Sequence, residues 1–561
     1  MKQLRSREWF REPSFYGFTR RAWLRAEGFS ADVFEGKPVI GICNSWSELN
    51  NCNTHLRQIA EAVKRGVWIA GGFPLEFPTI SLGEMFMKPT TMLYRNLMAM
   101  DVEESIRANP LDGVVLLCGC DKTAPAQLMG AASAGIPAIM VPGGPMLGGE
   151  WRNQTIGSGT DGRKLYDQYR AGKLSEEEWC EIEGCIARSA GHCAVMGTAS
   201  TMACLAETLG MTLPGGASIP APDSRRLAFA EASGRRIVDM VREDVWPSRI
   251  LTREAFENAI TVDMALGGST NAVVHLIAIA GRMGIDLPLA DFDGISRRTP
   301  CLANVKPSGA FLMEDFFRAG GLPALAREIL PLLHGDCLTV SGRSLAENVR
   351  DAACHDRNVI RSLGDPVFAE GGTAVLYGNL APDGAVLKQT AASARLLQHR
   401  GRAYVFENRE QMMAEIERAD LPVDERSVLV MKNCGPKGAP GFPEWGHIPL
   451  PRVLLDRGID DVVRVSDARM SGTSYGTVVV HVAPESAIGG PLAVVRTGDE
   501  VLLDVENRKL TLCLPDEEIE ERLKKFVPPP PAYDRGYGRL FLEHVTQANR
   551  GCDFDFLSVV R

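Results

Sequence analysis

Three cysteines lie in polar, glycine-rich segments, where a thiol is able to meet a ligand rather than fill an apolar core. Each is separated from the next by about 70 residues, which excludes the short spacing of a zinc knuckle. A shared metal or cluster site therefore requires a fold that joins three distant segments. A buried structural thiol is the alternative at each position. The three are Cys52 in Asn50-Asn51-Cys52-Asn53, Cys120 in Cys118-Gly119-Cys120-Asp121-Lys122, and Cys193 in Gly191-His192-Cys193.

Three carboxylates, Glu84, Asp121 and Glu444, lie in turn-like segments that contain few other charges. Hard divalent cations such as Mg²⁺ prefer oxygen ligands and often use only one or two carboxylates together with the substrate. The three side chains are therefore candidate magnesium ligands. A solvated surface position is the alternative for any one of them.

Two glycine motifs match known signatures but lack the structural context that those signatures need. Residues 472–476 match the G-x-S-x-G nucleophile elbow around Ser474, which requires a helix after the serine. Here the following residues 477–482 are predicted to form a strand. Residues 157–162 match the dinucleotide fingerprint, but no buried strand leads into them, so we predict a plain loop. A serine hydrolase that uses Ser474 stays open as a function of another class.

Alternating strands and helices position these residues in the first two-thirds of the chain. Continuous apolar runs followed by helical periodicity indicate a mostly parallel sheet covered on both faces. Polar turns follow two of the runs, and ligands gather at the carboxyl ends of such strands. The predicted strands are 37–42, 111–117 and 136–141, and the predicted helices are 54–70 and 124–134.

From about residue 371 short β-like runs separated by glycine- and proline-rich turns replace this pattern. We predict an N-terminal parallel-sheet α/β domain over residues 1–375 and a C-terminal β-rich, β-barrel-like domain over residues 376–561. The runs are 373–377, 402–406, 427–431, 461–465, 477–482 and 500–505.

The composition of the 561 residues excludes several classes of partner. The formal net charge of −9 argues against a general nucleic-acid binder, which needs basic patches to neutralise phosphates. We find no signal-type N-terminus and no uninterrupted apolar run of about 20 residues, so we expect no membrane segment. The 14 cysteines then indicate reduced thiols in a cytoplasmic protein rather than disulfides.

Several segments, taken in order along nearly the whole chain, resemble the dihydroxy-acid and sugar-acid dehydratase family. Each segment alone is a weak signal, whereas the ordered set is specific. The segments are Cys120-Asp121-Lys122-Thr123, Gly143-Gly144-Pro145-Met146, Met196-Gly197-Thr198-Ala199-Ser200-Thr201-Met202, Gly267-Gly268-Ser269-Thr270-Asn271-Ala272, Asn433-Cys434-Gly435-Pro436-Lys437-Gly438, Gly441-Phe442-Pro443-Glu444 and Ser466-Asp467-Ala468-Arg469-Met470-Ser471-Gly472-Thr473.

The resemblance implies two cofactors and an active site between the two domains. A [2Fe–2S] cluster held by three cysteines would match Cys52, Cys120 and Cys193. A Mg²⁺ site would match Glu84, Asp121 and Glu444 together with Lys122, the lysine that is carbamylated in relatives. The catalytic base of the family matches Ser471, with Thr473 close by, so the C-terminal domain carries the catalytic serine.

The resemblance further implies a hydro-lyase that dehydrates a 2,3-dihydroxy carboxylic acid to a 2-keto-3-deoxy acid. A cluster iron with an open position and Mg²⁺ would provide the Lewis acidity. The motifs favour the sugar-acid branch, which acts on pentonates such as L-arabinonate or D-xylonate. The alternative is the dihydroxy-acid dehydratase of branched-chain amino-acid biosynthesis.

We expect a small-molecule substrate and a homodimer or homotetramer. A non-catalytic iron–sulfur sensor is disfavoured because no DNA-reading motif is present.

Overall fold

Four strands of the N-terminal part form one parallel sheet in the computed structural model, which describes residues 3–559. The sheet order is β2-β1-β3-β4, and every neighbouring pair is parallel. The three strands predicted from the sequence are confirmed as β1, β3 and β4, which are buried along their whole length. The strands are β1 (Val39–Asn44), β2 (Phe73–Pro78), β3 (Gly113–Cys118) and β4 (Ala138–Pro142).

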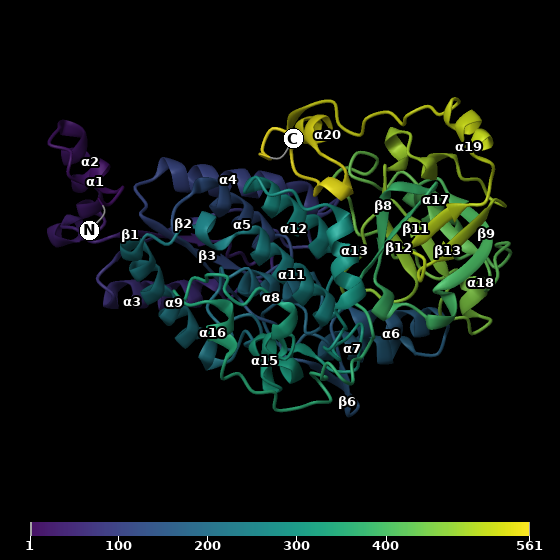
Figure 1. Cartoon of the computed structure of the whole chain (residues 1–561), viewed down its shortest axis with the longest axis horizontal. Helices are drawn as coiled ribbons and strands as arrows, with labels where there is room; N and C mark the ends of the chain where they lie inside the picture. Colours follow the sequence, from purple (N-terminus) through teal and green to yellow (C-terminus); the bar gives the residue numbers. More distant parts are fainter. Residues whose placement is uncertain (1–2, 560–561) are drawn as a thin grey trace.

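Helices cover both faces of this sheet, as the continuous apolar strands predict. Helix α3 (Leu56–Ile69) packs against α9 (Ser224–Glu243) on one side of the sheet. On the other side, α4 (Arg95–Ala108) packs against α5 (Thr123–Ala134) (Figure 1). The helices predicted at 54–70 and 124–134 are therefore confirmed as α3 and α5.

A second layer of buried helices joins the sheet to the barrel. Helix α12 (Asn271–Arg282) is buried at every position, and α11 (Arg253–Leu266) and α8 (Thr198–Thr208) are buried over most of their length. These helices pack on one another and on α5, so the main apolar core lies here rather than only beside the sheet. Helix α12 ends near the barrel in the middle of the molecule (Figure 1).

The C-terminal part is a closed eight-stranded barrel with the order β10-β11-β12-β8-β7-β14-β13-β9. The predicted fold class, an α/β domain with a β-barrel-like domain, is therefore confirmed. All six predicted runs coincide with strands, while β8 and β14 were missed. The strands are β7 (Ala374–Gly378), β8 (Ala381–Leu387), β9 (Gln398–Phe406), β10 (Val428–Met431), β11 (Val463–Ser466), β12 (Val478–Ala483), β13 (Glu500–Asp504) and β14 (Lys509–Leu512).

After the barrel the chain returns to the N-terminal part. Helix α20 (Gly536–His544) lies near α12, and Figure 1 shows α20 at the upper edge of the molecule, between the N-terminal part and the barrel. The Arg95 guanidinium donates hydrogen bonds to the carbonyl oxygens of Gly551 and Cys552, at 2.9 and 2.8 Å. Arg282 forms a buried ion pair with Asp553 at 2.6 Å. The domain boundary near residue 375 stays a prediction, although β7 begins at Ala374.

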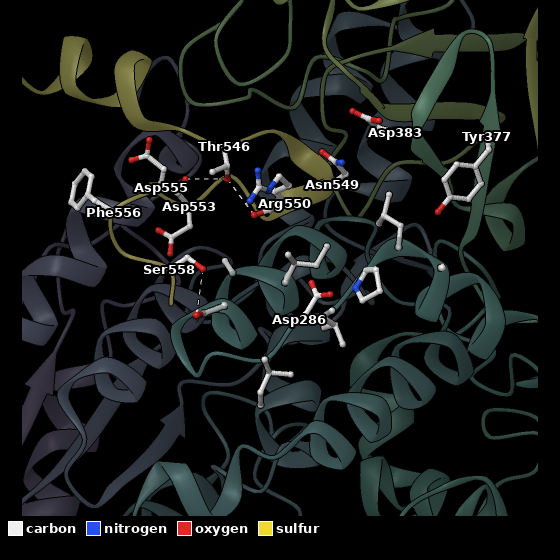
Figure 2. Close-up of a pocket in the computed structure, with 18 residues that line it drawn as sticks. Asp286, Tyr377, Asp383, Thr546, Asn549, Arg550, Asp553, Asp555, Phe556 and Ser558 are labelled. Atoms are coloured by element: carbon white, nitrogen blue, oxygen red, sulfur yellow. Dashed lines mark hydrogen bonds between the residues drawn. The ribbon is translucent and has the colours of Figure 1, made fainter. Parts of the chain in front are cut away.

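This return encloses a cavity of about 730 Å³ between α12, the β7–β8 hairpin and the C-terminal residues (Figure 2). None of the residues predicted to act in catalysis or metal binding lines this cavity. No helix within residues 3–559 is both long and apolar enough to cross a membrane.

The remaining elements are short or peripheral. They are α1 (Arg7–Phe10), α2 (Phe15–Ala26), β5 (Gly149–Trp151), β6 (Gln154–Ile156), α6 (Thr160–Arg170), α7 (Glu176–Cys185), α10 (Pro247–Ile250), α13 (Leu289–Arg298), α14 (Met313–Arg318), α15 (Gly321–Glu328), α16 (Leu345–Val349), α17 (Arg409–Glu415), α18 (Arg452–Leu455) and α19 (Asp516–Leu523).

Candidate active site

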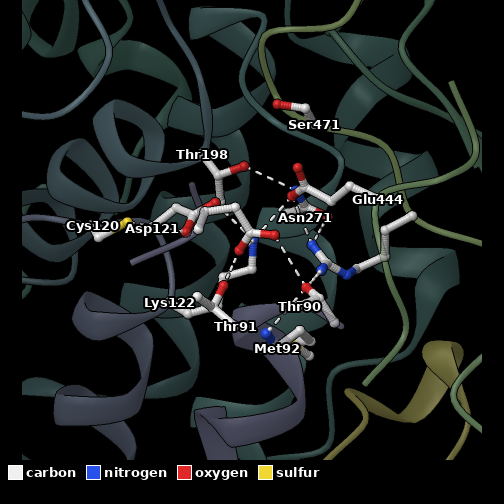
Figure 3. A network of polar contacts seen from close by, with 12 residues as sticks. Thr90, Thr91, Met92, Cys120, Asp121, Lys122, Thr198, Asn271, Glu444 and Ser471 are labelled. Atoms are coloured by element: carbon white, nitrogen blue, oxygen red, sulfur yellow. Dashed lines mark hydrogen bonds and ion pairs between the residues drawn. The ribbon is translucent and has the colours of Figure 1, made fainter. Parts of the chain in front are cut away.

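A buried lysine brings together the three carboxylates that were candidate magnesium ligands. Lys122 lies in the turn between β3 and α5, and its side chain is fully buried. Its Nζ lies 2.7 Å from Asp121 Oδ2, 2.9 Å from Glu444 Oε1 and 3.5 Å from Glu84 Oε2 (Figure 3). Three segments that are far apart in the sequence therefore meet at one ammonium group.

Neighbouring polar groups hold the two glutamates in place. Glu84, in the loop after β2, accepts hydrogen bonds from the hydroxyls of Thr90 and Thr91. Glu444, in the loop after β10, accepts from Arg469 Nη1 at 2.9 Å and from Asn271 Nδ2 at 3.0 Å. Buried charged groups need such partners, since an unpaired one costs several kcal/mol. The carboxylates are thus oriented before any ligand binds.

The charges of this cluster shift the pKa values of its members. Burial and the nearby Arg469 act to lower the pKa of Lys122, but the three carboxylates outweigh them and hold it above its ordinary value. Burial acts to raise the pKa of Glu444, yet Lys122 and Arg469 bring it down to about 2. Burial raises the pKa of Glu84 to about 7, against the opposing charge of Lys122. Positive charge is therefore strongly favoured at the point where the carboxylates converge.

The donor set at this point fits a hard divalent cation if the lysine loses its charge. The Lys122 ammonium occupies the point on which the carboxylates converge. As the side chains stand, no group of three or more His, Cys, Asp or Glu within residues 3–559 is arranged to hold a metal ion. A carbamylated lysine would carry a carboxylate in place of the ammonium and would complete a set of oxygen ligands of the type that Mg²⁺ prefers.

The three predicted cluster cysteines lie in loops that contact one another next to this point. The backbone N–H of Cys120 donates to Asn53 Oδ1 at 3.1 Å, and the backbone N–H of Gly191 donates to Asn51 O at 3.2 Å. A Cβ at Gly119 would lie 2.2 Å from the carbonyl oxygen of Cys52, so only glycine allows this approach. The loop of Cys52 therefore touches the loops of both other cysteines.

The thiols themselves also interact. A hydrogen bond with Cys120, burial, and the charges of Cys120 and Cys193 raise the pKa of Cys52 well above its ordinary value. Burial, followed by the charge of Cys120, raises the pKa of Cys193 to about 11. Thiolates this close repel one another, so they would need a cation between them to form. This donor set fits soft iron, which thiolates hold in iron–sulfur clusters.

Ser471 and Thr473 lie in the turn between β11 and β12, on the barrel side of the site. The two hydroxyl oxygens are 3.0 Å apart, and the Thr473 backbone N–H donates to Ser471 Oγ at 3.4 Å. Thr160 of α6 donates its hydroxyl to Thr473 O at 2.7 Å. In Figure 3 the Ser471 hydroxyl stands apart from the carboxylate network.

Asn271 and Arg469 connect the two parts of the site, and sequence reasoning did not single them out. Asn271 Nδ2 donates to Glu444, to the hydroxyl of Thr198 at 2.9 Å and to the carbonyl of Met470 at 3.1 Å. Arg469 Nη1 donates to Asn271 Oδ1 at 3.0 Å. Both residues fall inside motifs quoted for the family resemblance, which was the only signal that could have found them.

The two glycine motifs have other structural roles. Ser474 Oγ is buried without a hydrogen-bond partner among the described residues, and strand β12 follows it where a nucleophile elbow needs a helix. Residues 157–162 were predicted to be a plain loop, and this was wrong from Thr160 onward, where α6 begins. The helix starts there because Gly159, at a φ of +87°, turns the chain into it.

The fold and the site define a two-part enzyme whose buried centre combines carboxylates, thiols and a hydroxyl from both parts. The N-terminal family profile "Dihydroxy-acid/6-phosphogluconate dehydratase" matches residues 37–348, and the C-terminal profile of the same description matches residues 358–552. The chain belongs to the dihydroxy-acid/6-phosphogluconate dehydratase family. It is a dehydratase, and so a hydro-lyase.

Curated relatives are similar over almost their whole length. The L-arabinonate dehydratase of Rhizobium leguminosarum bv. trifolii (strain WSM2304) is 52% identical over 100% of this chain and 97% of its own. The 6-deoxy-6-sulfo-D-gluconate dehydratase of Pseudomonas putida is 50% identical, over 99% and 97%. A dihydroxy-acid dehydratase of Caldicellulosiruptor saccharolyticus is 41% identical, over 95% and 97%. The similarity is therefore higher to the two sugar-acid enzymes than to the dihydroxy-acid enzyme.

Proposed function

We propose that the chain removes water from a sugar acid with hydroxyls at C2 and C3, giving a 2-keto-3-deoxy acid. The observation that carries this proposal is the convergence of three carboxylates on Lys122 beside the loops of Cys52, Cys120 and Cys193. The higher identity to enzymes named for sugar acids supports this substrate class over dihydroxyisovalerate.

We assign cofactor roles to the side chains described above. Cys52, Cys120 and Cys193 would hold a [2Fe–2S] cluster. Glu84, Asp121 and Glu444, with a carbamylated Lys122, would hold Mg²⁺. When bound, these groups supply Lewis acidity at the leaving C3 hydroxyl and stabilise the negative charge that develops at the carboxylate and C2 hydroxyl.

Ser471 takes the C2 proton in this proposal. A free serine hydroxyl is too weak a base at neutral pH, so its oxygen must be stabilised in the ionised form. The Thr473 backbone N–H and hydroxyl lie at 3.4 and 3.0 Å from Ser471 Oγ and are placed to donate to it. The C2 proton passes to this oxygen and is then handed to the departing C3 hydroxyl, which leaves as water and restores the ionised serine. The resulting enol tautomerises to the keto acid.

Arg469 and Asn271 keep the carboxylate of Glu444 in place during this sequence. Both side chains are fully buried, and both contact Glu444 and each other. Their burial excludes bulk water from this side of the site, which strengthens the electrostatic interactions there.

The decisive experiment is anaerobic purification followed by a substrate panel with keto-acid detection. The panel contains L-arabinonate, D-xylonate, further aldonic acids and 2,3-dihydroxyisovalerate. We expect the highest kcat/KM with an aldonate. A higher kcat/KM with dihydroxyisovalerate would favour the branched-chain enzyme, and turnover of none of them would refute the proposal.

We further propose a cytoplasmic homodimer or homotetramer. A molar mass of one chain in light scattering would contradict that assembly.

A further inference from the structure

A lysine and an aspartate without catalytic assignment are buried behind the turn that carries Ser471. Lys388 directly follows strand β8, and Asp263 lies in helix α11. Their side chains are 0% and 1% exposed. Burying two charged groups is costly, and well-packed apolar residues are often more stable in their place. The pair therefore calls for an explanation other than stability.

Lys388 contacts the backbone of the turn that carries Ser471, residues 471–473, which we call the serine turn. Its Nζ donates a hydrogen bond to the carbonyl oxygen of Gly472 at 3.4 Å. The N–H of that same peptide group belongs to Thr473, and it points at Ser471 Oγ from 3.4 Å. One peptide unit thus accepts from the lysine at its oxygen and donates to the serine at its nitrogen.

The turn has no room to adjust its position. A Cβ at Gly472 would lie 2.6 Å from the Thr198 backbone nitrogen and 2.7 Å from Ser269 Oγ. This packing presses the Gly472 peptide against α8 and the start of α12. The peptide is therefore held between the lysine on one side and Ser471 on the other.

Asp263 is the acidic neighbour of Lys388 and forms no direct hydrogen bond or ion pair with it among residues 3–559. Both of its carboxylate oxygens are buried and have no hydrogen-bond partner among residues 3–559. Burial raises the pKa of Asp263 to about 8, against the charge of Lys388. Burial lowers the pKa of Lys388 to about 8, while the charges of Asp263 and Cys301 oppose this shift. The Lys388 amine therefore keeps its proton at neutral pH.

We propose that Lys388 is a positioning residue that acts on Ser471 through the Gly472–Thr473 peptide. A cation at the carbonyl oxygen polarises the peptide and makes its N–H a stronger donor. That donor stabilises the ionised Ser471 oxygen and fixes its direction. This inference rests on the proposed role of Ser471 as the base.

The test compares Lys388→Met, Lys388→Arg and the double variant Lys388→Met/Asp263→Asn in the cofactor-loaded enzyme. The double variant removes both buried titratable groups, so no carboxyl group is left to ionise without its cationic neighbour. We expect kcat to fall by about 10- to 100-fold in Lys388→Met and in the double variant, with KM little changed. The acid limb of the kcat–pH profile should move up by about one pH unit, because the serine oxygen loses stabilisation. Lys388→Arg should recover part of the rate.

Lys432→Met is the matched control, since it removes another buried barrel lysine, which pairs with Glu407 at 2.9 Å instead of contacting the serine turn. It should keep the wild-type kcat and pH profile. A double variant with wild-type thermal midpoint, kcat and pH profile would overturn the inference. A Ser471→Ala enzyme that still turns over would instead refute the proposed base, so the two failures are distinguishable.

Discussion

At the scale of single residues, the proposed magnesium site requires that Lys122 lose its positive charge. Its ammonium is surrounded by three carboxylates. Burial raises the pKa of Glu84, whereas the charges of Lys122 and Arg469 lower the pKa of Glu444 against the effect of burial. Replacing that ammonium by a carbamate would exchange one positive charge for a negative one at the same point. The carboxylates would then require a cation in its place, which is the physical basis for the magnesium assignment.

Glu444→Gln tests this assignment. The amide removes one negative ligand but keeps the shape, so Arg469 and Asn271 retain a neighbour of the same size. We expect the Mg²⁺ concentration for half-maximal activity to rise by about tenfold or more. An unchanged magnesium titration would remove Glu444 from the ligand set. Glu407→Gln, whose carboxylate pairs with Lys432 elsewhere in the barrel, is the control.

Cys120→Ser tests the cluster assignment. The hydroxyl nearly preserves the volume of the thiol but is a poor ligand for iron, so we expect loss of the iron–sulfur absorbance and of turnover. Circular dichroism should stay close to that of the wild type. Cys204→Ser is the control, because this buried thiol lies in α8 and is not one of the three predicted ligands. Equal iron content in both variants would contradict the assignment.

His481 links the site region to the acid stability of the protein. Burial, aided by Arg469, lowers its pKa to about 3, whereas an unfolded histidine titrates near 6.5. Between these values the unfolded state binds a proton that the folded state does not. Stability is therefore lost as the pH falls below about 6.5, by up to about 1.4 kcal/mol per pH unit for this group.

His481→Asn should make the fall in thermal midpoint between pH 6.5 and 5 shallower. Asparagine does not titrate, and it tolerates the φ of +58° at this position. His355→Asn, at an exposed position, should leave the slope unchanged. The same slope in both variants would show that burial of His481 does not govern acid stability.

How much of the site was predictable differs between its residues. The cysteines and the acids were singled out by their polar or turn-like surroundings, whereas their roles and the choice of Ser471 came from the family resemblance and stay predictions. Spacing alone could not join them, because about 70 residues separate one cysteine from the next. Asn271 and Arg469 were missed since an amide or guanidinium has no signature of its own. Their roles follow only from the contacts with Glu444.

At the scale of elements, the start of helix α6 packs against the serine turn. Gly159, which precedes the helix, packs against Thr473 so closely that a Cβ would lie 2.6 Å from Thr473 Oγ1. Thr160 adds a hydrogen bond to the same residue. The position of the Thr473 hydroxyl therefore depends on the start of an N-terminal helix.

Gly159→Ala should displace Thr473 and lower kcat by about tenfold or more, because small misplacements at a reacting centre are costly. Gly172→Ala is a matched control. It imposes a similar left-handed strain, at a φ of +69°, but a Cβ there would meet nothing within 4 Å. Its activity should stay normal. Equal activity of the two variants would mean that contact with Thr473 does not matter.

The buried strands of the parallel sheet were easier to predict than barrel strand β8 or the buried helices α11 and α12. The fully buried strands β1, β3 and β4 are continuous apolar runs, so their sequence carries a strong signal. Strand β8 was missed because Pro382, Asp383 and Gly384 interrupt its pattern where the strand is irregular. Helices α11 and α12 were not predicted, because no predicted strand adjoins them in the sequence to mark them as part of the alternating pattern.

At the scale of the whole molecule, residues 551–553, which follow the barrel, bind side chains of α4 and α12. The buried ion pair of Arg282 with Asp553 uses two contacts, at 2.6 and 3.1 Å. In the same segment the rings of Phe541 and Phe554 pack edge to face, with their centroids 5.8 Å apart. Because Arg95 of α4 also binds this segment, the last described residues support the layer that carries Asn271.

Asp553→Asn should lower the free energy of unfolding by about 3 kcal/mol, because it leaves the buried Arg282 guanidinium poorly compensated. The drop appears as a lower midpoint in denaturant titration. Glu543→Gln breaks an exposed ion pair with Arg539 in α20 and should leave the midpoint unchanged. Equal midpoints for the two variants would show that the C-terminal segment does not hold the two parts together.

The position of the site residues along the chain also sets an order of assembly during synthesis on the ribosome. The three thiols and the parallel sheet belong to the first 193 residues, so the nascent polypeptide can fold them while the barrel is still being translated. Glu444 and the serine turn emerge much later, and Asp553 last of all. On the proposed assignment the thiols would be available to iron early, whereas the magnesium ligands would be complete only once translation has passed Glu444.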